Sequence, residues 1–130
     1  MFLNDYKYTI VQTVASMAVY KFISFYAGYQ RGKANIKAPA VTGDKNFEIA
    51  FGIQRNTLES LPVYLTSLWL YVLCGGSDFN AGVAGGLWNV GRVLYFMGYP
   101  NKRSLGFGLG FLAETYLMGS VGYSAIKAIL

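Results

Sequence analysis

The chain has 130 residues, of which 54% are hydrophobic and only 13% are charged, whereas soluble domains carry about 25% charged residues. A single Cys and the absence of His exclude a disulfide framework, a His-based metal site and a His general base. The net charge of +5 does not indicate nucleic acid binding, because the basic residues lie mostly in loops and form no continuous face. We therefore expect an all-α integral membrane protein with no bound metal, in which the positive charge sets the orientation.

Four stretches are apolar enough to cross a bilayer, which requires about 20 mostly apolar residues for each span. They cover residues 8–29, 47–74, 81–99 and 105–130. Short polar segments rich in Gly, Pro and Asp separate them. We therefore predict one domain, residues 1–130, built as a membrane-spanning four-helix bundle.

The charges in the loops predict the orientation of these spans. Basic residues gather in the first and third loops, namely Arg31, Lys33, Lys37 and Lys45 in the first and Lys102 and Arg103 in the third. The second loop carries only Asp78. Because the first and third loops of a four-span chain lie on the same side, the positive-inside rule puts both in the cytosol and both termini opposite.

Glycines recur along the third and fourth stretches, at Gly82, Gly85, Gly86, Gly91, Gly106, Gly110, Gly119 and Gly122. Small residues let helices approach closely in lipid, and Gly106 and Gly110 form a G-x-x-x-G motif. Two interpretations stay open at this point. The glycines form a specific packing face, or they reflect the ordinary enrichment of glycine in membrane helices.

Charged side chains inside the apolar stretches each require a partner, water or a function, since a charge in mid-membrane costs roughly 2.5–3.5 kcal/mol. Arg55 and Glu59 are four residues apart on one helix and can pair with each other. The third stretch carries a stripe at helical spacing: Trp88, Arg92, Tyr95 and Tyr99. The polar turns of the second stretch and this stripe either line a hydrophilic slot or hold helices together, and spacing favours neither.

Several motifs, taken in order along the chain, resemble the MAPEG family (membrane-associated proteins in eicosanoid and glutathione metabolism). They are Phe47-Glu48, Asn56-Thr57-Leu58-Glu59 followed by Pro62, Gly91-Arg92-Val93-Leu94-Tyr95, Gly98-Tyr99 and Lys102-Arg103-Ser104. The likeness is strongest from about Phe47 to Gly106. The nearest branch looks like microsomal glutathione transferase type 3, with the leukotriene-forming synthases behind it.

The resemblance implies a four-helix protomer that assembles as a homotrimer and uses glutathione as co-substrate. Glutathione would bind between the second helix of one protomer and neighbouring helices, near the cytosolic face, and a lipophilic electrophile or lipid hydroperoxide would arrive from the bilayer. The implied catalytic residues are Arg103, which activates the thiol, and Arg31, near the end of the first helix. The candidate glutathione contacts are Asn56, Glu59, Tyr95 and Tyr99, with Gln54 and Arg92 completing the set.

Thiol activation explains why an arginine is needed. A free cysteine thiol has a pKa near 8.5, so only a small fraction is the nucleophilic thiolate at neutral pH. Lowering that pKa by about two units requires roughly 2.7 kcal/mol of preferential stabilisation of the anion. An Arg at the edge of a low-dielectric site supplies this electrostatically, without a general base, which suits a chain with no His.

Some positions depart from the family pattern. The family places an Arg four residues before the motif Asn, where this chain has Gly52. Many members have a His at the position of Gln54, and many have a Tyr at the position of Ser60. Two functions are therefore expected as alternatives. One is a membrane glutathione transferase or peroxidase of the endoplasmic reticulum or mitochondrial membrane. The other is a catalytically degenerate protein of this fold, acting as an accessory subunit of a larger membrane complex or as a lipid-binding scaffold.

Overall fold

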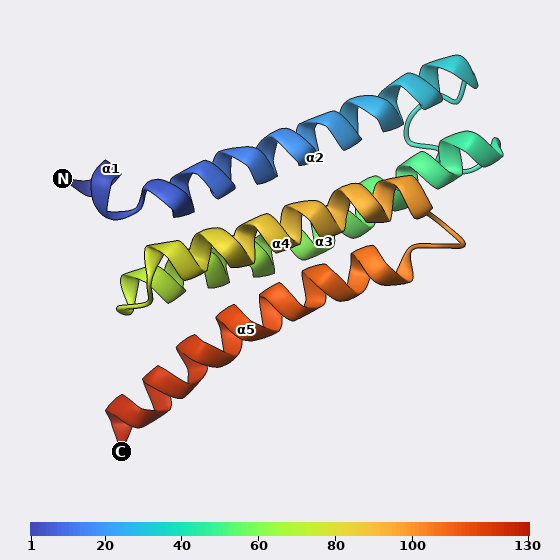
Figure 1. Ribbon diagram of the computed structural model, residues 1–130. Coiled ribbons are helices and arrows are strands. Elements are labelled where there is room, and N and C mark those ends of the chain that lie inside the picture. The colour runs from blue at the N-terminus through green and yellow to red at the C-terminus, as the bar shows by residue number, and fades with distance from the viewer.

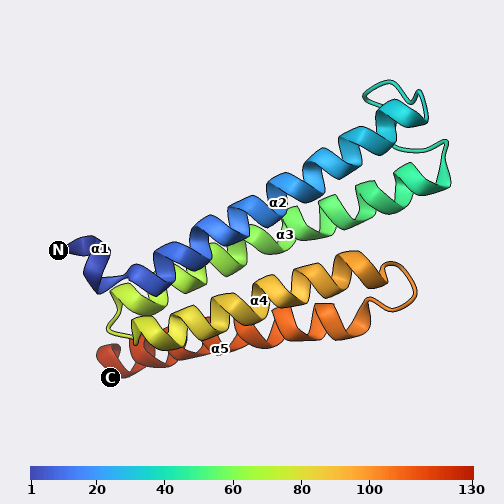
Figure 2. The same ribbon diagram turned by 45° about the horizontal axis from the view of Figure 1, so that its top comes forward.

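The computed structural model describes all residues from 1 to 130 and contains five helices and no strand, so the all-α prediction is confirmed (Figure 1). The helices are α1 (Phe2–Asp5), α2 (Lys7–Lys33), α3 (Lys45–Leu73), α4 (Asp78–Gly98) and α5 (Ser104–Ile129). The four long helices lie where the sequence has its four apolar stretches. Both termini and the α3–α4 turn lie at one end, and the two basic loops lie at the other (Figures 1 and 2).

Side-chain caps and one glycine fix where the helices begin and end. Asp44 caps α3 by accepting a hydrogen bond of 2.9 Å from the Phe47 backbone N–H, and Ser77 caps α4 in the same way. After α3, Gly75 takes a left-handed conformation with φ of +95°, which suits glycine because it has no Cβ. The resulting hydrogen bonds from Gly75 and Gly76 back to the last turn of α3 close a tight turn of the Schellman type.

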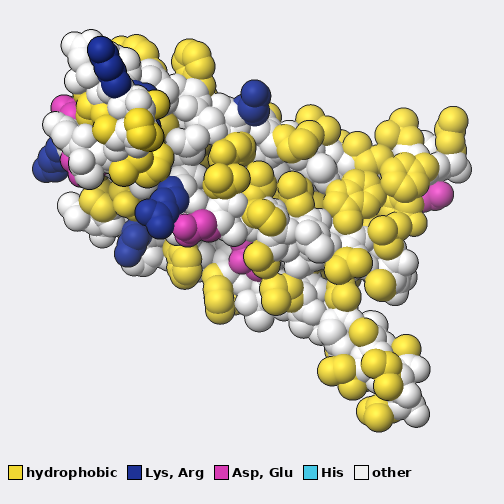
Figure 3. Space-filling model, turned by 180° about the vertical axis from the view of Figure 1, so that it is seen from behind, with side chains coloured by type: hydrophobic (Ala, Val, Ile, Leu, Met, Phe, Trp, Pro, Cys, Tyr) yellow, Lys and Arg dark blue, Asp and Glu magenta, His cyan; other side chains and the backbone are white.

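The surface is largely apolar. Figure 3 shows hydrophobic side chains over most of one face, with basic side chains gathered mainly at the end that carries the two loops. Phe25 is 75% exposed and Met97 is 74% exposed. By length and composition, α2 is the one helix that qualifies by itself as a membrane span. The crossing of all four helices stays a prediction.

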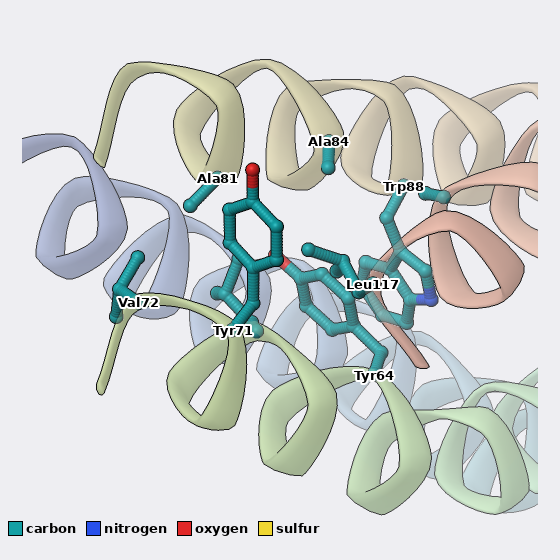
Figure 4. Packing of buried hydrophobic residues seen from close by; sticks show 9 residues of the cluster. Tyr64, Tyr71, Val72, Ala81, Ala84, Trp88 and Leu117 are labelled. Carbon is teal, nitrogen blue, oxygen red and sulfur yellow. The ribbon is translucent and has the colours of Figure 1, made fainter. Parts of the chain in front are cut away.

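An aromatic stack lies at the centre of the bundle. Tyr64 on α3 and Trp88 on α4 are completely buried, and their rings stack with centroids 4.2 Å apart (Figure 4). Such pairs contribute about 0.5–1.5 kcal/mol beyond the area they bury. The Tyr64 hydroxyl is hydrogen-bonded to Ser16 of α2 at 2.9 Å, so one stack connects three helices. The other members of this cluster are Leu68, Tyr71, Val72, Ala81, Ala84, Ala113 and Leu117.

Asp78, the first residue of α4, ties α4 to the beginning of α2. Its carboxylate accepts hydrogen bonds from the backbone N–H groups of Tyr8, at 3.0 Å, and Thr9, at 2.9 Å, and from the Thr9 hydroxyl at 2.7 Å. The first amides of a helix have no partner within the helix and favour a negative charge. Partial burial acts to raise the pKa of the Asp78 carboxyl, but these hydrogen bonds and the charge of Lys7 outweigh it and leave the pKa below its usual value.

We expect Asp78→Asn to weaken this contact, because an amide offers one acceptor oxygen where the carboxylate offers two. Since the pKa of Asp78 is lowered in the folded state, the free energy it contributes is present above its ordinary value of 3.8 and is lost as pH falls through the lowered value. Thermal unfolding in detergent, followed over a series of pH values, should therefore show acid destabilisation that Asp78→Asn reduces. The exposed Asp5→Asn is the matched control, and identical pH curves for all three proteins would contradict the prediction.

The helices α4 and α5 approach each other closely at two glycines, Gly91 and Gly106. A Cβ at Gly91 would lie 2.7 Å from the Gly106 carbonyl oxygen, and a Cβ at Gly106 would collide with the Gly91 oxygen and the Tyr95 nitrogen. By contrast, a Cβ at Gly119 or Gly122 would meet nothing within 4 Å. The packing-face interpretation therefore holds for Gly91 and Gly106, and the enrichment interpretation fits Gly119 and Gly122.

We expect Gly106→Ala to destabilise the protein by about 1–3 kcal/mol, the usual cost of overpacking a close contact. Gly119→Ala is its matched control on the same helix, and it should be neutral or slightly stabilising because Ala favours helix over Gly by about 1 kcal/mol. Thermal unfolding in detergent measures both. Equal melting temperatures for the two variants would show that the close contact of α4 with α5 is not required.

Candidate functional site

A polar cavity of about 220 Å³ lies among α3, α4 and α5. Its walls combine three ionisable side chains with two small polar ones and an apolar side. The lining residues are Asn56, Glu59, Ser60, Val63, Arg92, Phe107, Phe111 and Glu114. The structure therefore brings together three of the candidate glutathione contacts, namely Asn56, Glu59 and Arg92.

Arg92 is the central charged group of this cavity. Its side chain is 2% exposed, and its Nη1 donates a hydrogen bond of 2.8 Å to Asn56 Oδ1. The guanidinium carbon lies 4.9 Å from the centroid of the Tyr95 ring and 5.5 Å from that of Trp88, distances at which cation–π attraction operates. Arg92 Nε is buried without a hydrogen-bond partner. The cavity thus holds a buried cation whose hydrogen-bonding capacity is not filled by the protein.

Glu59 reaches the cavity from a more exposed position. Its carboxylate pairs with Arg55 at 3.3 Å across one helical turn, as the spacing predicts, and both side chains are more than half exposed. Exposed pairs of this kind contribute less than about 1 kcal/mol. Glu59 is therefore readily available to a ligand with a positive group.

Ser60, Trp88 and Glu114 form a hydrogen-bonded cluster that the sequence analysis did not predict. The Ser60 hydroxyl donates a short hydrogen bond to Glu114 Oε1. Trp88 Nε1 lies 3.1 Å from the same oxygen and 3.1 Å from Ser60 Oγ. The charge of Glu114 inside an apolar stretch was the available signal, but its partners come from two other helices and no local spacing connects them.

Tyr99 fills the space beside Gly52. A Cβ at position 52 would lie 2.5 Å from the Tyr99 hydroxyl, so this oxygen stands where the family pattern expects the base of an Arg side chain. The Tyr99 ring lies 5.4 Å from that of Tyr95, and the Arg103 guanidinium carbon lies 6.0 Å from the Tyr99 ring centroid. The structure therefore connects Tyr95, Tyr99 and Arg103 in a row from the buried Arg92 to the basic loop.

Five candidate residues do not line the cavity in the single chain, namely Gln54, Arg31, Tyr95, Tyr99 and Arg103. Gln54 donates to the Ser24 hydroxyl of α2 at 3.3 Å, on a different side of α3. Arg31 donates to the Ala40 carbonyl at 2.7 Å and its guanidinium carbon lies 4.5 Å from the Phe47 ring centroid. Arg31 thus ties the first loop to the end of α2.

Comparison with known proteins identifies the family. The MAPEG family model matches residues 9–123. The chain belongs to the MAPEG family. It is 35% identical to human microsomal glutathione S-transferase 2 over 118 residues, which cover 85% of this chain and 78% of the relative, and 32% identical to the bovine protein of the same name over the same shares. An uncharacterized protein of Synechocystis is 35% identical over 112 residues, or 84% of this chain and 80% of the relative.

These findings confirm the family suggested by the motifs but do not show the branch. The named MAPEG relatives are of type 2, whereas the motifs suggested type 3, and an assignment to type 3 stays a prediction. The matched segment includes all four long helices in whole or in part and every residue of the polar cavity. The cavity therefore lies entirely within the segment that matches the family.

Asn56 holds the one hydrogen bond that Arg92 makes, so we expect Asn56→Leu to destabilise the protein by about 1.5–3 kcal/mol, the usual contribution of a hydrogen bond to a charged group. The double variant Asn56→Leu/Arg92→Met should recover part of this loss, because removing both partners leaves no buried charge unpaired. Thermal unfolding in detergent is the measurement, with the exposed Asn46→Leu as matched control. A double variant less stable than Asn56→Leu alone would contradict this account.

Proposed function

We propose that this chain is a membrane glutathione transferase that activates the thiol of glutathione for attack on lipophilic electrophiles or lipid hydroperoxides. The observation that carries the proposal is the cavity in which Asn56, Glu59 and Arg92 meet. Membership of the MAPEG family and relatives named microsomal glutathione S-transferase support it. Exposed apolar side chains on several helices suit a protein whose second substrate arrives from lipid.

In this proposal the cavity residues hold the glutathione backbone. Because Arg92 donates to Asn56 Oδ1, the Asn56 amide is held with its Nδ2 available as a donor to a ligand carbonyl. Glu59, exposed and only weakly paired, would accept the ammonium group. Tyr95 and Tyr99 would add hydroxyl contacts from α4.

Arg103 is the residue that would lower the pKa of the glutathione thiol. It stands at the N-cap of α5, where the positive end of the helix dipole also favours an anion. No acidic residue lies in the first turn of α5, where its negative charge would weaken the attraction of an anion. The thiolate, once formed, attacks the electrophilic atom of the second substrate.

We further propose assembly as a homotrimer or within a larger membrane complex. Gln54 is bonded to Ser24 of α2 and Arg31 to the first loop, so in this proposal they contact glutathione bound to a neighbouring copy. The proposed location is the endoplasmic reticulum or mitochondrial membrane, with the first and third loops in the cytosol. The concentration of basic side chains at that end supports this orientation.

A non-catalytic accessory subunit or lipid-binding scaffold is the alternative, and one observation favours it. Position 52 is Gly and lacks the Arg side chain of the family pattern, and the Tyr99 hydroxyl occupies the space where that side chain would begin. The two functions differ in whether glutathione binds. Retention on glutathione-agarose in detergent, followed by conjugation of chlorodinitrobenzene and reduction of cumene hydroperoxide, separates them, and absence of retention at millimolar glutathione would favour the alternative.

We expect Arg103→Ala to reduce kcat/KM for chlorodinitrobenzene by about 100-fold, which corresponds to a thiol pKa higher by about two units. The pH profile of the rate should move upward accordingly, and the ultraviolet absorbance of bound thiolate at neutral pH should fall. Lys102→Ala removes a neighbouring charge from the same turn and should change the rate less than about twofold. Equal effects of the two substitutions would indicate a general charge effect and contradict a specific role for Arg103.

A further inference from the structure

Lys21 is a charged residue that no contact within the chain explains. It is exposed and takes part in none of the ion pairs of the structure. It stands near the middle of α2, the helix that qualifies by itself as a membrane span. In a hydrocarbon layer about 30 Å thick, this position is too deep for a lysine stem to carry its ammonium group to the headgroups. Lys21 therefore requires a partner inside the membrane.

The surface around Lys21 is otherwise apolar. Val14 and Met17 precede Lys21 and Phe25 follows it, at intervals of three or four residues, so the four side chains share one face of α2. The three apolar ones are between 48% and 75% exposed. We call this face the α2 stripe. It presents one cation in an apolar surface that no other helix of the chain covers.

A matching stripe with one carboxylate runs along α5. Phe107, Phe111, Glu114 and Met118 follow one another at intervals of four, three and four residues, so they too share one face. The three apolar side chains are 49%, 57% and 52% exposed. We call this face the α5 stripe. The two stripes are complementary, since each has apolar side chains on both sides of a single charge and the two charges are opposite.

The carboxylate of Glu114 has an oxygen available for a cation. Ser60 and Trp88 hold Oε1. Oε2 accepts no hydrogen bond, yet it is not among the atoms buried without a partner, so it is accessible. No basic side chain lies within ion-pair distance of it. The other carboxylate of the cavity, that of Glu59, is already paired with Arg55, so Glu114 is the carboxylate that lacks a cation.

Lys21 and Glu114 lie at nearly the same depth in the bundle. Lys21 is twelve residues from Lys33, the last residue of α2, and Glu114 is ten residues from Ser104, the first of α5. At 1.5 Å for each residue, these separations are about 18 Å and 15 Å. Both helix ends adjoin the basic loops at the same end of the bundle (Figure 2). Copies related by rotation about the membrane normal keep their depth, so Lys21 of one copy is level with Glu114 of another.

The two side chains cannot meet within one chain. The helices α2 and α5 both pack against α3 and α4, and they lie on opposite sides of that pair (Figure 1). Lys21 is on the outer face of α2, whereas Ser16 and Ile23 are among the buried residues of its inner face. A partner for Lys21 therefore has to come from another molecule.

We propose that Lys21 of one copy forms an ion pair with Glu114 of a neighbouring copy, with the α2 stripe of the first packed against the α5 stripe of the second. The inference rests on the assembly of several copies in the proposed function, and it names the contact that joins them. Each copy thereby contributes a charged residue to the cavity of the next. The ammonium group binds Oε2 of Glu114, and Asn56, Glu59 and Arg92 stay free for glutathione. Because the contact joins two different faces, repetition closes a ring of copies.

Chemical linkage of the wild type tests the contact directly. Dicyclohexylcarbodiimide dissolves in lipid and activates a carboxylate, and an amine in contact with that carboxylate then forms an amide as dicyclohexylurea leaves. In phosphatidylcholine vesicles, we expect covalent oligomers on a denaturing gel whose peptides are joined at Lys21 and Glu114, and no such link in the monomer band. Lys21→Met and Glu114→Gln should each abolish the link. Lys127→Met, which removes a lysine from the last turn of α5, is the matched control and should keep it.

A double-mutant cycle measures whether the two side chains act together. Cys74 is the one cysteine of the chain and is exposed, so donor and acceptor dyes attached there report association of copies in detergent by energy transfer. Lys21→Met and Glu114→Gln should each weaken association by at least about tenfold, because the remaining charge loses its partner. The double variant should associate no more weakly than either single variant, since no unpaired charge is left. Lys127→Met should associate like the wild type.

The outcomes separate this contact from the rest of the proposal. A wild type that is monomeric in vesicles would overturn both the proposed assembly and this inference. An oligomeric wild type without the Lys21–Glu114 link, or losses of association that add in the double variant, would overturn the inference alone. A linked protein that fails to conjugate chlorodinitrobenzene would support the inference and overturn the proposed transferase activity.

Discussion

The close contact of two helix backbones determines the geometry of the cavity. At Gly91 and Gly106, α4 and α5 approach so closely that neither position has room for a Cβ. This contact sets the register of α5, and the side chains that follow it meet partners on α4. A Cβ at Gly110 would lie 3.5 Å from Arg92 Nη2, so Gly110 faces the guanidinium. One turn later, Glu114 accepts a hydrogen bond from Trp88. A larger residue at the contact would therefore alter the cavity as well as the packing.

Within one chain, two charged groups of the cavity, Arg92 and Glu114, are held by neutral polar partners in place of ion pairs. The cation of Arg92 is held by Asn56 and aromatic faces, and the carboxylate of Glu114 by Ser60 and Trp88. Neutral partners satisfy part of the hydrogen-bonding capacity of each charged group, and they leave its net charge uncompensated. Both groups therefore keep an electrostatic influence over the cavity between them, which a closed ion pair would have cancelled.

The sequence predicted the helices well because apolar stretches, caps and turn residues are local features. It also predicted the Arg55–Glu59 pair, which depends only on helical spacing. It did not predict the contact of Ser60 with Glu114, because 54 residues separate them and the contact exists only after three helices pack. The position of Tyr99 beside Gly52 was missed for the same reason, since the sequence shows a missing side chain but not what fills its place. Family motifs supplied the other candidate residues. Asn56, Glu59 and Arg92 line the cavity of one chain, and the remaining candidates do not, namely Gln54, Tyr95, Tyr99, Arg31 and Arg103.

Different contacts hold the helices together at the two ends of the bundle. At the end with the termini, Asp78 binds α2 to α4 through three hydrogen bonds, and the turn at Gly75 joins α3 directly to α4. At the opposite end the first loop is longer, and Arg31 anchors it mainly to its own carbonyls. Near this end the helices α4 and α5 stay in close contact at Gly91 and Gly106, so the first loop is the less anchored connection. In the proposed function, a water-soluble peptide would enter beside these loops, and an oily molecule would reach the same site from the side of the bundle.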